Sequence, residues 1–261
     1  MTLDLHVHSV FSDGKDTPED IVRAAIERGV DVLGFSDHAY TSFDTSYCMK
    51  KEDVPRYKAT IAELKKRYEG RIRILCGIEQ DVFSDDPPEG FDYVIGSVHY
   101  VRAGGEYYAV DESPAQTRRA VKAAFGGDLT AFARAYYEET ARAAQDADII
   151  GHFDLVEKFS ETEPDLAPEG EDYTALWQNA VTRLLPYGKP FEINTGAVSR
   201  GYRADPYLSG EKLSFALARG AKVLLSSDAH NKETILFGFD TFGSLVPASQ
   251  KTLDFLPFLN L

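Results

Sequence analysis

The chain of 261 residues is 43% hydrophobic and 27% charged, which is ordinary for a globular protein long enough to bury a sizeable core. Its formal net charge of −14 repels nucleic-acid phosphates and anionic lipids, so we expect neither a nucleic-acid polymer nor a membrane as a partner. No apolar run approaches the about 20 residues that span a bilayer. The N-terminus lacks the basic and apolar regions of a signal peptide, which predicts a cytoplasmic protein.

Strand-like and helix-like stretches alternate along the chain. Residues 3–7 form the first predicted strand. The first helix begins near Thr17, a good capping residue followed by Pro18, and stops near Gly29. The other predicted strands span residues 30–36, 71–78, 93–98, 147–151, 189–194 and 221–227. The other predicted helices cover about residues 57–68, 114–125, 129–145, 173–185 and 209–220.

Three stretches depart from this alternation. Residues 100–127 are an insertion that contains one of the helices and could act as a lid or as a passive cover. Residues 160–171 are acidic and contain proline, which predicts a loop, and the tail from residue 231 shows no clear pattern. The cysteines, Cys48 and Cys76, follow no metal-binding spacing, and Cys76 is predicted to be a buried apolar residue.

Polar side chains gather where the predicted strands end. Strands separated by helices pair in parallel through crossover connections. Each of the seven strands is followed by histidine, carboxylate or amide side chains, and in a closed barrel those ends meet at one face. We therefore predict an α/β fold, one domain over residues 1–261, and a barrel whose active site lies at the C-terminal ends of its strands. The side chains concerned are His6, His8, Asp37, His38, Glu79, His99, His152, Glu192, Asn194, Asp228 and His230.

The histidines indicate a metal site. His6 and His8 are two residues apart on a strand and therefore point to the same face, and the same spacing relates Asp228 to His230. With Glu79 they form a set of imidazoles and carboxylates without a thiolate, which suits zinc, manganese or iron. A single histidine at a strand end is usually a hydrogen-bonded structural residue. The joint placement of all six favours ligation.

These motifs resemble those of the PHP (polymerase and histidinol phosphatase) superfamily. The opening segment His6-Val7-His8-Ser9, with Ser12-Asp13-Gly14, resembles the first motif. The later motifs follow in the same order as SDH at 36–38, GIE at 77–79, GSVH at 96–99, GHFD at 151–154 and SDAH at 227–230. Within the superfamily, the segments GSVHY, GHFDLVEKF and EINTGAVSRG look most like the stand-alone histidinol-phosphate phosphatases.

The resemblance implies a distorted seven-stranded (βα)7 barrel of the PHP type that holds three divalent metal ions, zinc, manganese or iron. It places the first ion on His6, His8, Glu79 and Asp228. Glu79 bridges to the second ion, which His99 and His152 also bind. Asp13, His38 and His230 hold the third. Each of these positions carries the expected residue type in this chain.

The implied activity is that of a phosphomonoesterase in which a metal-bridging hydroxide attacks phosphorus. The general acid for the leaving group is Asp13, His38 or Asp228, among which the sequence does not choose. Arg200 is the candidate for phosphate binding, because a guanidinium can donate two parallel hydrogen bonds to phosphate. Lys158 is a second candidate, although Glu157 beside it departs from the basic residue that many relatives carry.

Further candidates lie on the sixth strand and on the rim loops. Glu192 and Asn194 are predicted to contact the substrate or to hold metal ligands in place from behind. Tyrosines on the rim loops are candidates for an aromatic wall against a flat substrate ring. They are Tyr40, Tyr47, Tyr100, Tyr107 and Tyr108.

The leading hypothesis is therefore hydrolysis of L-histidinol phosphate, a step of histidine biosynthesis, by a monomer or small homo-oligomer. The alternative is another phosphoesterase of the same superfamily: a tyrosine phosphatase, a small-nucleotide phosphodiesterase or a nuclease. A barrel that binds metal without catalysis is a third possibility. Such a non-catalytic barrel would lack some of the metal ligands, whereas this chain carries the expected residue at every ligand position.

Overall fold

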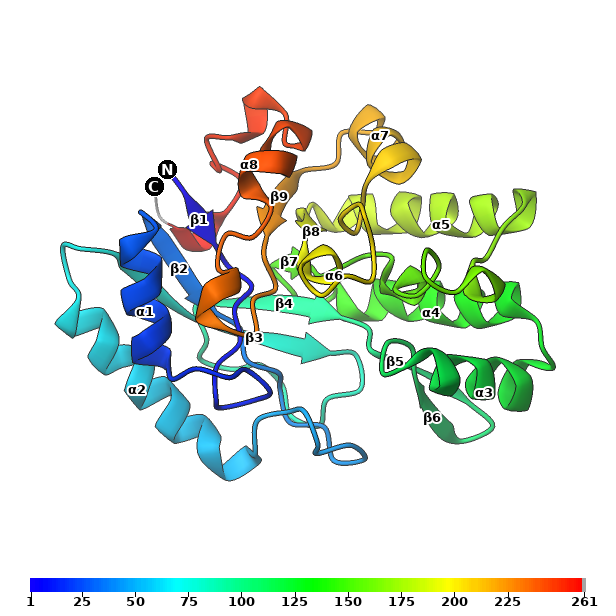
Figure 1. Ribbon diagram of the computed structural model, residues 1–261, viewed down its shortest axis with the longest axis horizontal. Coiled ribbons are helices and arrows are strands. Elements are labelled where there is room, and N and C mark those ends of the chain that lie inside the picture. The colour runs from blue at the N-terminus through cyan, green and yellow to red at the C-terminus, as the bar shows by residue number, and fades with distance from the viewer. Residues whose placement is uncertain (260–261) are drawn as a thin grey trace.

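Seven parallel strands form the centre of the computed structural model, which describes residues 1–259 (Figure 1). Along the sheet their order is β1 (Leu3–Asp4), β2 (Val32–Phe35), β3 (Arg73–Asp81), β4 (Tyr93–Ser97), β7 (Ile149–Ile150), β8 (Phe191–Asn194) and β9 (Val223–Ser226). Each strand lies within a predicted stretch, except that β3 continues beyond residue 78. The predicted seven-stranded α/β barrel is confirmed.

The barrel closes only at the C-terminal ends of its strands. The first and last strands, β1 and β9, form no ladder, and a single parallel bridge joins Val7 to Ala229. The His8 N–H donates to the Ala229 carbonyl at 2.8 Å, and the Ala229 N–H donates to the His6 carbonyl at 3.1 Å. The seam is therefore closed by the segments that carry the histidines, which explains the distortion of the barrel.

Helices cover the barrel on both sides (Figure 1). On one side lie α1 (Pro18–Glu27) and α2 (Val54–Arg67), and on the other lie α3 (Pro114–Phe125), α4 (Leu129–Ala143) and α5 (Glu171–Leu184). Three shorter helices follow: α6 (Gly196–Ser199), α7 (Gly210–Ala218) and α8 (Phe239–Phe242). The predicted capping is confirmed at α1, where the Thr17 hydroxyl accepts a hydrogen bond from the Asp20 N–H.

The insertion at residues 100–127 contains a hairpin that the sequence analysis did not predict. The antiparallel strands β5 (Tyr100–Ala103) and β6 (Glu106–Ala109) precede α3, which matches its predicted bounds. Val101 and Val110 are fully buried in the core that also contains α4. The insertion is therefore anchored in the barrel, and its inner edge reaches the cavity described below.

The C-terminal tail closes the opposite end of the barrel. Leu253, Leu256 and Leu259 are buried together with Leu3, Leu5, Tyr93 and Ile95 of the central strands and their flanks. The Phe258 ring stacks on Tyr93 with 5.3 Å between ring centroids. This contact joins segments far apart in sequence, so the local pattern of the tail did not reveal it.

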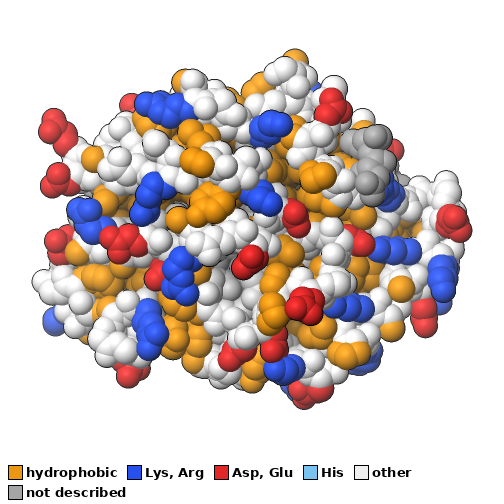
Figure 2. Space-filling model, turned by 180° about the vertical axis from the view of Figure 1, so that it is seen from behind, with side chains coloured by type: hydrophobic (Ala, Val, Ile, Leu, Met, Phe, Trp, Pro, Cys, Tyr) orange, Lys and Arg blue, Asp and Glu red, His pale blue; other side chains and the backbone are white. Residues whose placement is uncertain are grey.

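The surface and the cysteines agree with a globular domain. Figure 2 shows acidic and basic side chains interspersed over the back face, with hydrophobic side chains between them. Within residues 1–259, no helix combines the length and apolar character needed to cross a bilayer. Cys48 and Cys76 are free and buried, so the prediction of a buried Cys76 is confirmed.

Candidate metal centre

The structure brings all nine predicted metal ligands together at the C-terminal ends of the strands. Their nitrogen and oxygen atoms form overlapping groups in which every ligand atom lies within 4.8 Å of the others. The groups are His8, Asp13, His38 and His230; His6, His8 and Asp228; His6, Glu79 and His152; and His38, Glu79 and His99. The groups share members, because His6, His8, His38 and Glu79 each lie in two of them.

The backbone reasons for this convergence differ from the predicted ones. β9 ends at Ser226, and Asp228 has a φ of 51°. A left-handed turn, and not the alternation of side chains along a strand, therefore directs Asp228 and His230 into the centre of the cluster. β1 ends at Asp4, and His6 and His8 lie in the segment held by the Val7 bridge. The expectation that these pairs lie on strands is wrong, because both ladders end before each pair and only the isolated Val7–Ala229 bridge joins the two segments.

Glu79 lies at the middle of the cluster, inside β3 and not after it as predicted. Its Oε2 atom is 3.1 Å from His6 Nε2 and 3.0 Å from His38 Nδ1. Its Oε1 atom is 2.9 Å from His152 Nε2 and 3.3 Å from His99 Nε2. Because its two oxygens face different pairs of imidazoles, this carboxylate has the geometry of a bridge between adjacent cations.

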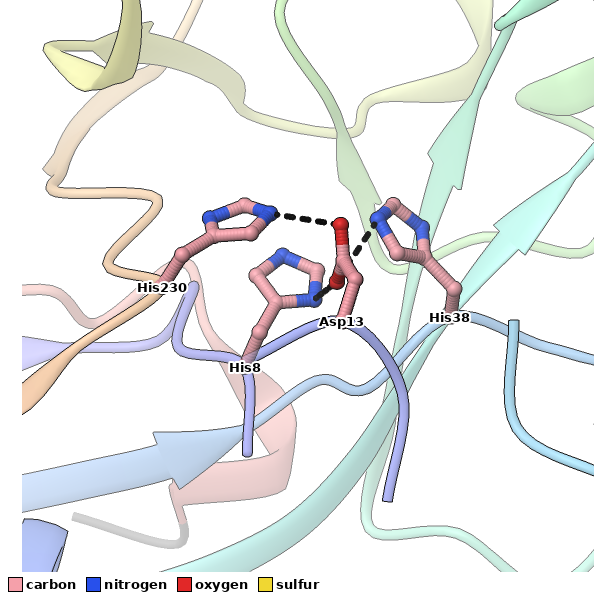
Figure 3. A group of neighbouring side chains, drawn as sticks. All are labelled: His8, Asp13, His38 and His230. Carbon is pink, nitrogen blue, oxygen red and sulfur yellow. Dashed lines mark ion pairs between the residues drawn. The ribbon is translucent and has the colours of Figure 1, made fainter. Parts of the chain in front are cut away.

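Asp13 is the carboxylate of the outer group, shown in Figure 3. Its oxygens are 3.2 Å from His230 Nε2, 3.7 Å from His38 Nε2 and 3.8 Å from His8 Nδ1. The three rings surround one carboxylate and come from three separate strand ends (Figure 3). This arrangement offers a set of nitrogen and oxygen ligands for a single ion.

Glu192 and Asn194 lie behind the cluster. Glu192 accepts a hydrogen bond from His6 Nδ1 at 2.8 Å and from the His152 N–H at 3.1 Å. The Asn194 amide donates to Glu192 at 3.2 Å, and its oxygen accepts from the Gly196 N–H. Both side chains are fully buried and neither lines the cavity, so their substrate contact stays a prediction. Their contacts fit the other predicted role, that of orienting His6.

Asp81 and Asp37 support predicted ligands, and the sequence predicted no such role for either. Asp81 accepts from the His99 N–H at 2.7 Å and lies 3.2 Å from His99 Nδ1. Asp37 accepts from the Ser12 hydroxyl at 2.7 Å and therefore fixes the turn that carries Asp13. The strand pattern offered a signal for Asp81, because it is two residues beyond Glu79 in β3 and shares its face.

The charges of the cluster are strongly coupled. Burial disfavours a charged His6, but Glu192 and Glu79 nevertheless raise its pKa well above the ordinary value. Burial and the neighbouring His230 lower the pKa of His8 to about 3. Burial disfavours an ionised Glu79, yet the surrounding histidines, His6 foremost, hold its pKa well below its usual range. A neutral imidazole and an ionised carboxylate are the forms that bind metals.

Buried atoms without partners show that the residues fit metal ions. Among residues 1–259, His6 Nε2, both ring nitrogens of His8 and Glu79 Oε2 are buried without a hydrogen-bond partner. Leaving such atoms unpaired costs free energy. All of them point into the ligand groups, where a cation would satisfy them together. The absence of thiolate among the ligands suits zinc, manganese or iron.

A cavity of about 370 Å³ opens over the cluster. Arg200 lines it and donates to the Asp228 carboxylate at 3.0 Å and to the Asp228 carbonyl at 3.2 Å. Lys158 lines it too, with its Nζ 2.7 Å from the Asp111 carbonyl oxygen. Both predicted basic residues therefore line the same cavity as predicted metal ligands.

The rim tyrosines divide into two sets. Tyr47 and Tyr100 line the cavity, whereas Tyr40, Tyr107 and Tyr108 are absent from its lining and are not part of the predicted aromatic wall. A larger cavity of about 710 Å³ lies at the seam between β1 and β9 but contains none of the predicted ligands. We assign the chemistry to the smaller cavity, because predicted metal ligands and both predicted basic residues line it.

Comparisons with known proteins agree with this geometry. The PHP domain family model matches residues 4–196. A protein of Deinococcus radiodurans named probable histidinol-phosphatase is 30% identical over 90% of this chain and 89% of its own length. The structure of HisK from Listeria monocytogenes superposes with a TM-score of 0.78 at 20% identity, over 92% of this chain and all of that one.

A further solved structure carries ligands. The histidinol phosphate phosphatase of Lactococcus lactis, in complex with zinc, L-histidinol and phosphate, has a TM-score of 0.68 at 20% identity, over 94% of this chain and 92% of that one. Fold and site together define a barrel built to hold catalytic metal ions at its C-terminal face. The chain belongs to the PHP domain family, which confirms the resemblance found in the sequence.

Proposed function

We propose that this chain is a metal-dependent phosphomonoesterase that hydrolyses L-histidinol phosphate to L-histidinol and phosphate. The observation that carries the proposal is Glu79 placed between two pairs of imidazoles, below a cavity that Arg200 also lines. The relative from Deinococcus radiodurans bears the name of this activity and matches nearly the whole chain. The Lactococcus lactis enzyme of the same fold binds both products.

The metal assignment remains that of the sequence analysis: His6, His8, Glu79 and Asp228 for the first ion, Glu79, His99 and His152 for the second, and Asp13, His38 and His230 for the third. Each set lies within overlapping groups of ligand atoms. Bound divalent ions neutralise charge on the phosphoryl group and lower the pKa of water. Glu192 behind His6 and Asp81 behind His99 keep the rings in the orientation that ligation requires.

Basic side chains of the cavity bind the phosphate. The Arg200 guanidinium lies beside Asp228 and His230 and presents donors for two phosphoryl oxygens. Lys158 adds a second positive charge, and Asp111 holds its Nζ in place. The monoester dianion is thus oriented with its phosphorus above the cluster, because its negative charge is attracted from both sides.

The leaving alkoxide requires a proton, and the three candidates Asp13, His38 and Asp228 all line the cavity. Arg200 holds Asp228 at 3.0 Å, and Glu79 faces His38 at 3.0 Å. The Asp13 side chain is the most exposed of the three, at 32% compared with 9% and 7%. Burial disfavours an ionised Asp13, but His38 and His230 nevertheless hold the pKa of its carboxyl well below its usual range. We therefore assign to Asp13 the transfer of a proton from water at the cavity mouth to the leaving oxygen.

A substrate panel tests the proposal. The purified protein is loaded in turn with manganese, zinc and iron and given histidinol phosphate, p-nitrophenyl phosphate, phosphotyrosine and small cyclic nucleotides. We expect kcat/KM for histidinol phosphate to exceed the others by at least about a hundredfold, which corresponds to about 2.7 kcal/mol. Similar rates for all monoesters would contradict the proposed substrate but would still support the phosphomonoesterase reaction. A preference for cyclic nucleotides would indicate a phosphodiesterase.

A further inference from the structure

The cavity over the metal centre is electrically asymmetric. A row of neighbouring side chains crosses the cavity from the positively charged Arg200 to the negatively charged Asp44. Arg200 lies 3.3 Å from His230, and the Tyr100 hydroxyl at the other end donates to Asp44 at 2.7 Å. Between these ends the ring centroids are 6.2 Å apart for His230 and His38, 4.9 Å for His38 and Tyr47, and 6.1 Å for Tyr47 and Tyr100.

The Asp44 carboxylate is held by neutral groups. One oxygen accepts from the Ser46 N–H at 3.0 Å and from the Ser46 hydroxyl at 2.6 Å, and the other accepts from Tyr100. Within residues 1–259 no basic side chain forms an ion pair with it. Asp111 in the same cavity differs, because Lys158 lies 3.2 Å from its carboxylate. Asp44 is therefore a fixed negative charge of the cavity that the protein leaves unbalanced.

We propose that Asp44 is a specificity-determining residue that binds a protonated nitrogen of the substrate. The inference rests on the proposed function and deepens it: phosphate lies at the Arg200 end, and the cationic end of the same molecule lies against Asp44. Tyr47 and Tyr100 line the space between and present aromatic faces and edges to a flat ring. The site thus selects phosphomonoesters that carry a cationic nitrogen at a distance from the phosphate, and it repels the free dianion at its outer end.

Steady-state kinetics on two substrates test this role. Asp44→Asn keeps the size of the side chain and an acceptor oxygen for Ser46, and it removes the charge; its amide nitrogen can donate to the Tyr100 oxygen in place of the present bond. We expect the KM for histidinol phosphate to rise about tenfold with kcat within twofold of wild type, because a charge-assisted hydrogen bond common to ground and transition state is lost. Hydrolysis of p-nitrophenyl phosphate, which has no cation, should not slow. Glu106→Gln is the matched control, because it removes one charge from exposed β6 outside this cavity and should change neither substrate.

A second variant tests whether Asp44 must be oriented by Tyr100, without a change in the packing of the loop. Tyr100→Phe retains the aromatic ring and removes the hydroxyl that orients Asp44, so we expect a smaller, about threefold, rise in the KM for histidinol phosphate alone. Equal losses on both substrates in both variants would show that Asp44 only supports the loop and would overturn the inference. So would an Asp44→Asn enzyme that keeps the full preference. A wild-type enzyme without any preference for histidinol phosphate would instead contradict the proposed function itself.

Discussion

The two ends of this barrel are built from the same strands but contain opposite chemistry. At the N-terminal end, Leu3, Leu5 and Tyr93 pack against the leucines of the tail in a cluster without unpaired polar atoms. At the C-terminal end, buried histidine and carboxylate atoms face one another without hydrogen-bond partners. The first end lowers the free energy of the fold, and the second raises it until cations are bound. Stability and chemistry are thus located about one strand length apart and can be perturbed separately.

The sharpest test of this division is Glu79→Gln. The amide cannot bridge two cations as a carboxylate does, so we expect turnover to fall to the uncatalysed background and metal content to fall with it. Phosphate release and elemental analysis of the purified protein measure both. Glu63→Gln on the exposed face of α2 is the control. The division between a stabilising end and a chemical end would be contradicted if the variant stays active after treatment with a chelator. It would also be contradicted if the far-UV circular dichroism of the variant shows an unfolded chain.

The opposite change is made at the other end, with Leu256→Ala. Leu256 is 2% exposed, and removal of its buried side chain should lower the free energy of unfolding by about 2–5 kcal/mol. Urea denaturation gives this value, and kcat of the folded fraction should stay unchanged. A variant of wild-type stability but reduced kcat would show that the two ends are not independent.

Glu192→Gln tests the support behind the ligands. It replaces the charged partner of His6 Nδ1 with a neutral one of equal size, and we expect metal affinity to fall about 10–100-fold. Titration of the metal-stripped protein measures the affinity, and saturating metal should restore most of the kcat. Asp81→Asn behind His99 is the matched variant on β3. Loss of kcat that excess metal does not restore would contradict a purely orienting role.

The smallest expected effect lies outside the ligand groups, at the cap of α1. Thr17→Ala removes the hydroxyl that accepts from the Asp20 N–H and should cost about 1 kcal/mol of stability. Thermal unfolding measures the loss, and metal content and kinetics should remain those of the wild type. A change in metal content would mean that the segment before α1, which contains Asp13, is held by its helix more than by Asp37.

The sequence predicted most of the secondary structure because the relevant signals are local. Thr17 and Pro18 begin α1, and α3 has the predicted bounds because Ser113 caps it and Gly126 ends it. The hairpin of β5 and β6 was missed because its strands are short and half exposed. The tail was missed for another reason: its leucines match neither period clearly and are buried in a cluster with residues from strands distant along the chain, such as Leu3 and Tyr93.

At the candidate site, too, the sequence revealed local features and missed those that depend on long-range contacts. The histidine ligands could be named from their position after the strands, because parallel strands of a barrel end at one face. The roles of Glu192 and Asn194 could not, because alternation on β8 does not say whether an inward side chain reaches the cavity or stops behind His6. Asp44 lies in a loop without periodicity, and only its contact with Tyr100 from the insertion places it at the cavity.

The sequence by itself therefore determined the order of strands and helices, the choice of nitrogen and oxygen ligands, and the PHP family. These follow from short-range patterns: capping, periodicity and the residue types that end each strand. The tertiary structure decided the left-handed turn at Asp228, the position of Glu79 between two pairs of imidazoles and the unbalanced charge of Asp44. Each of these three features depends on contacts between segments that are distant along the chain. Tertiary packing, and not local propensity, determines which atoms of these segments come into contact.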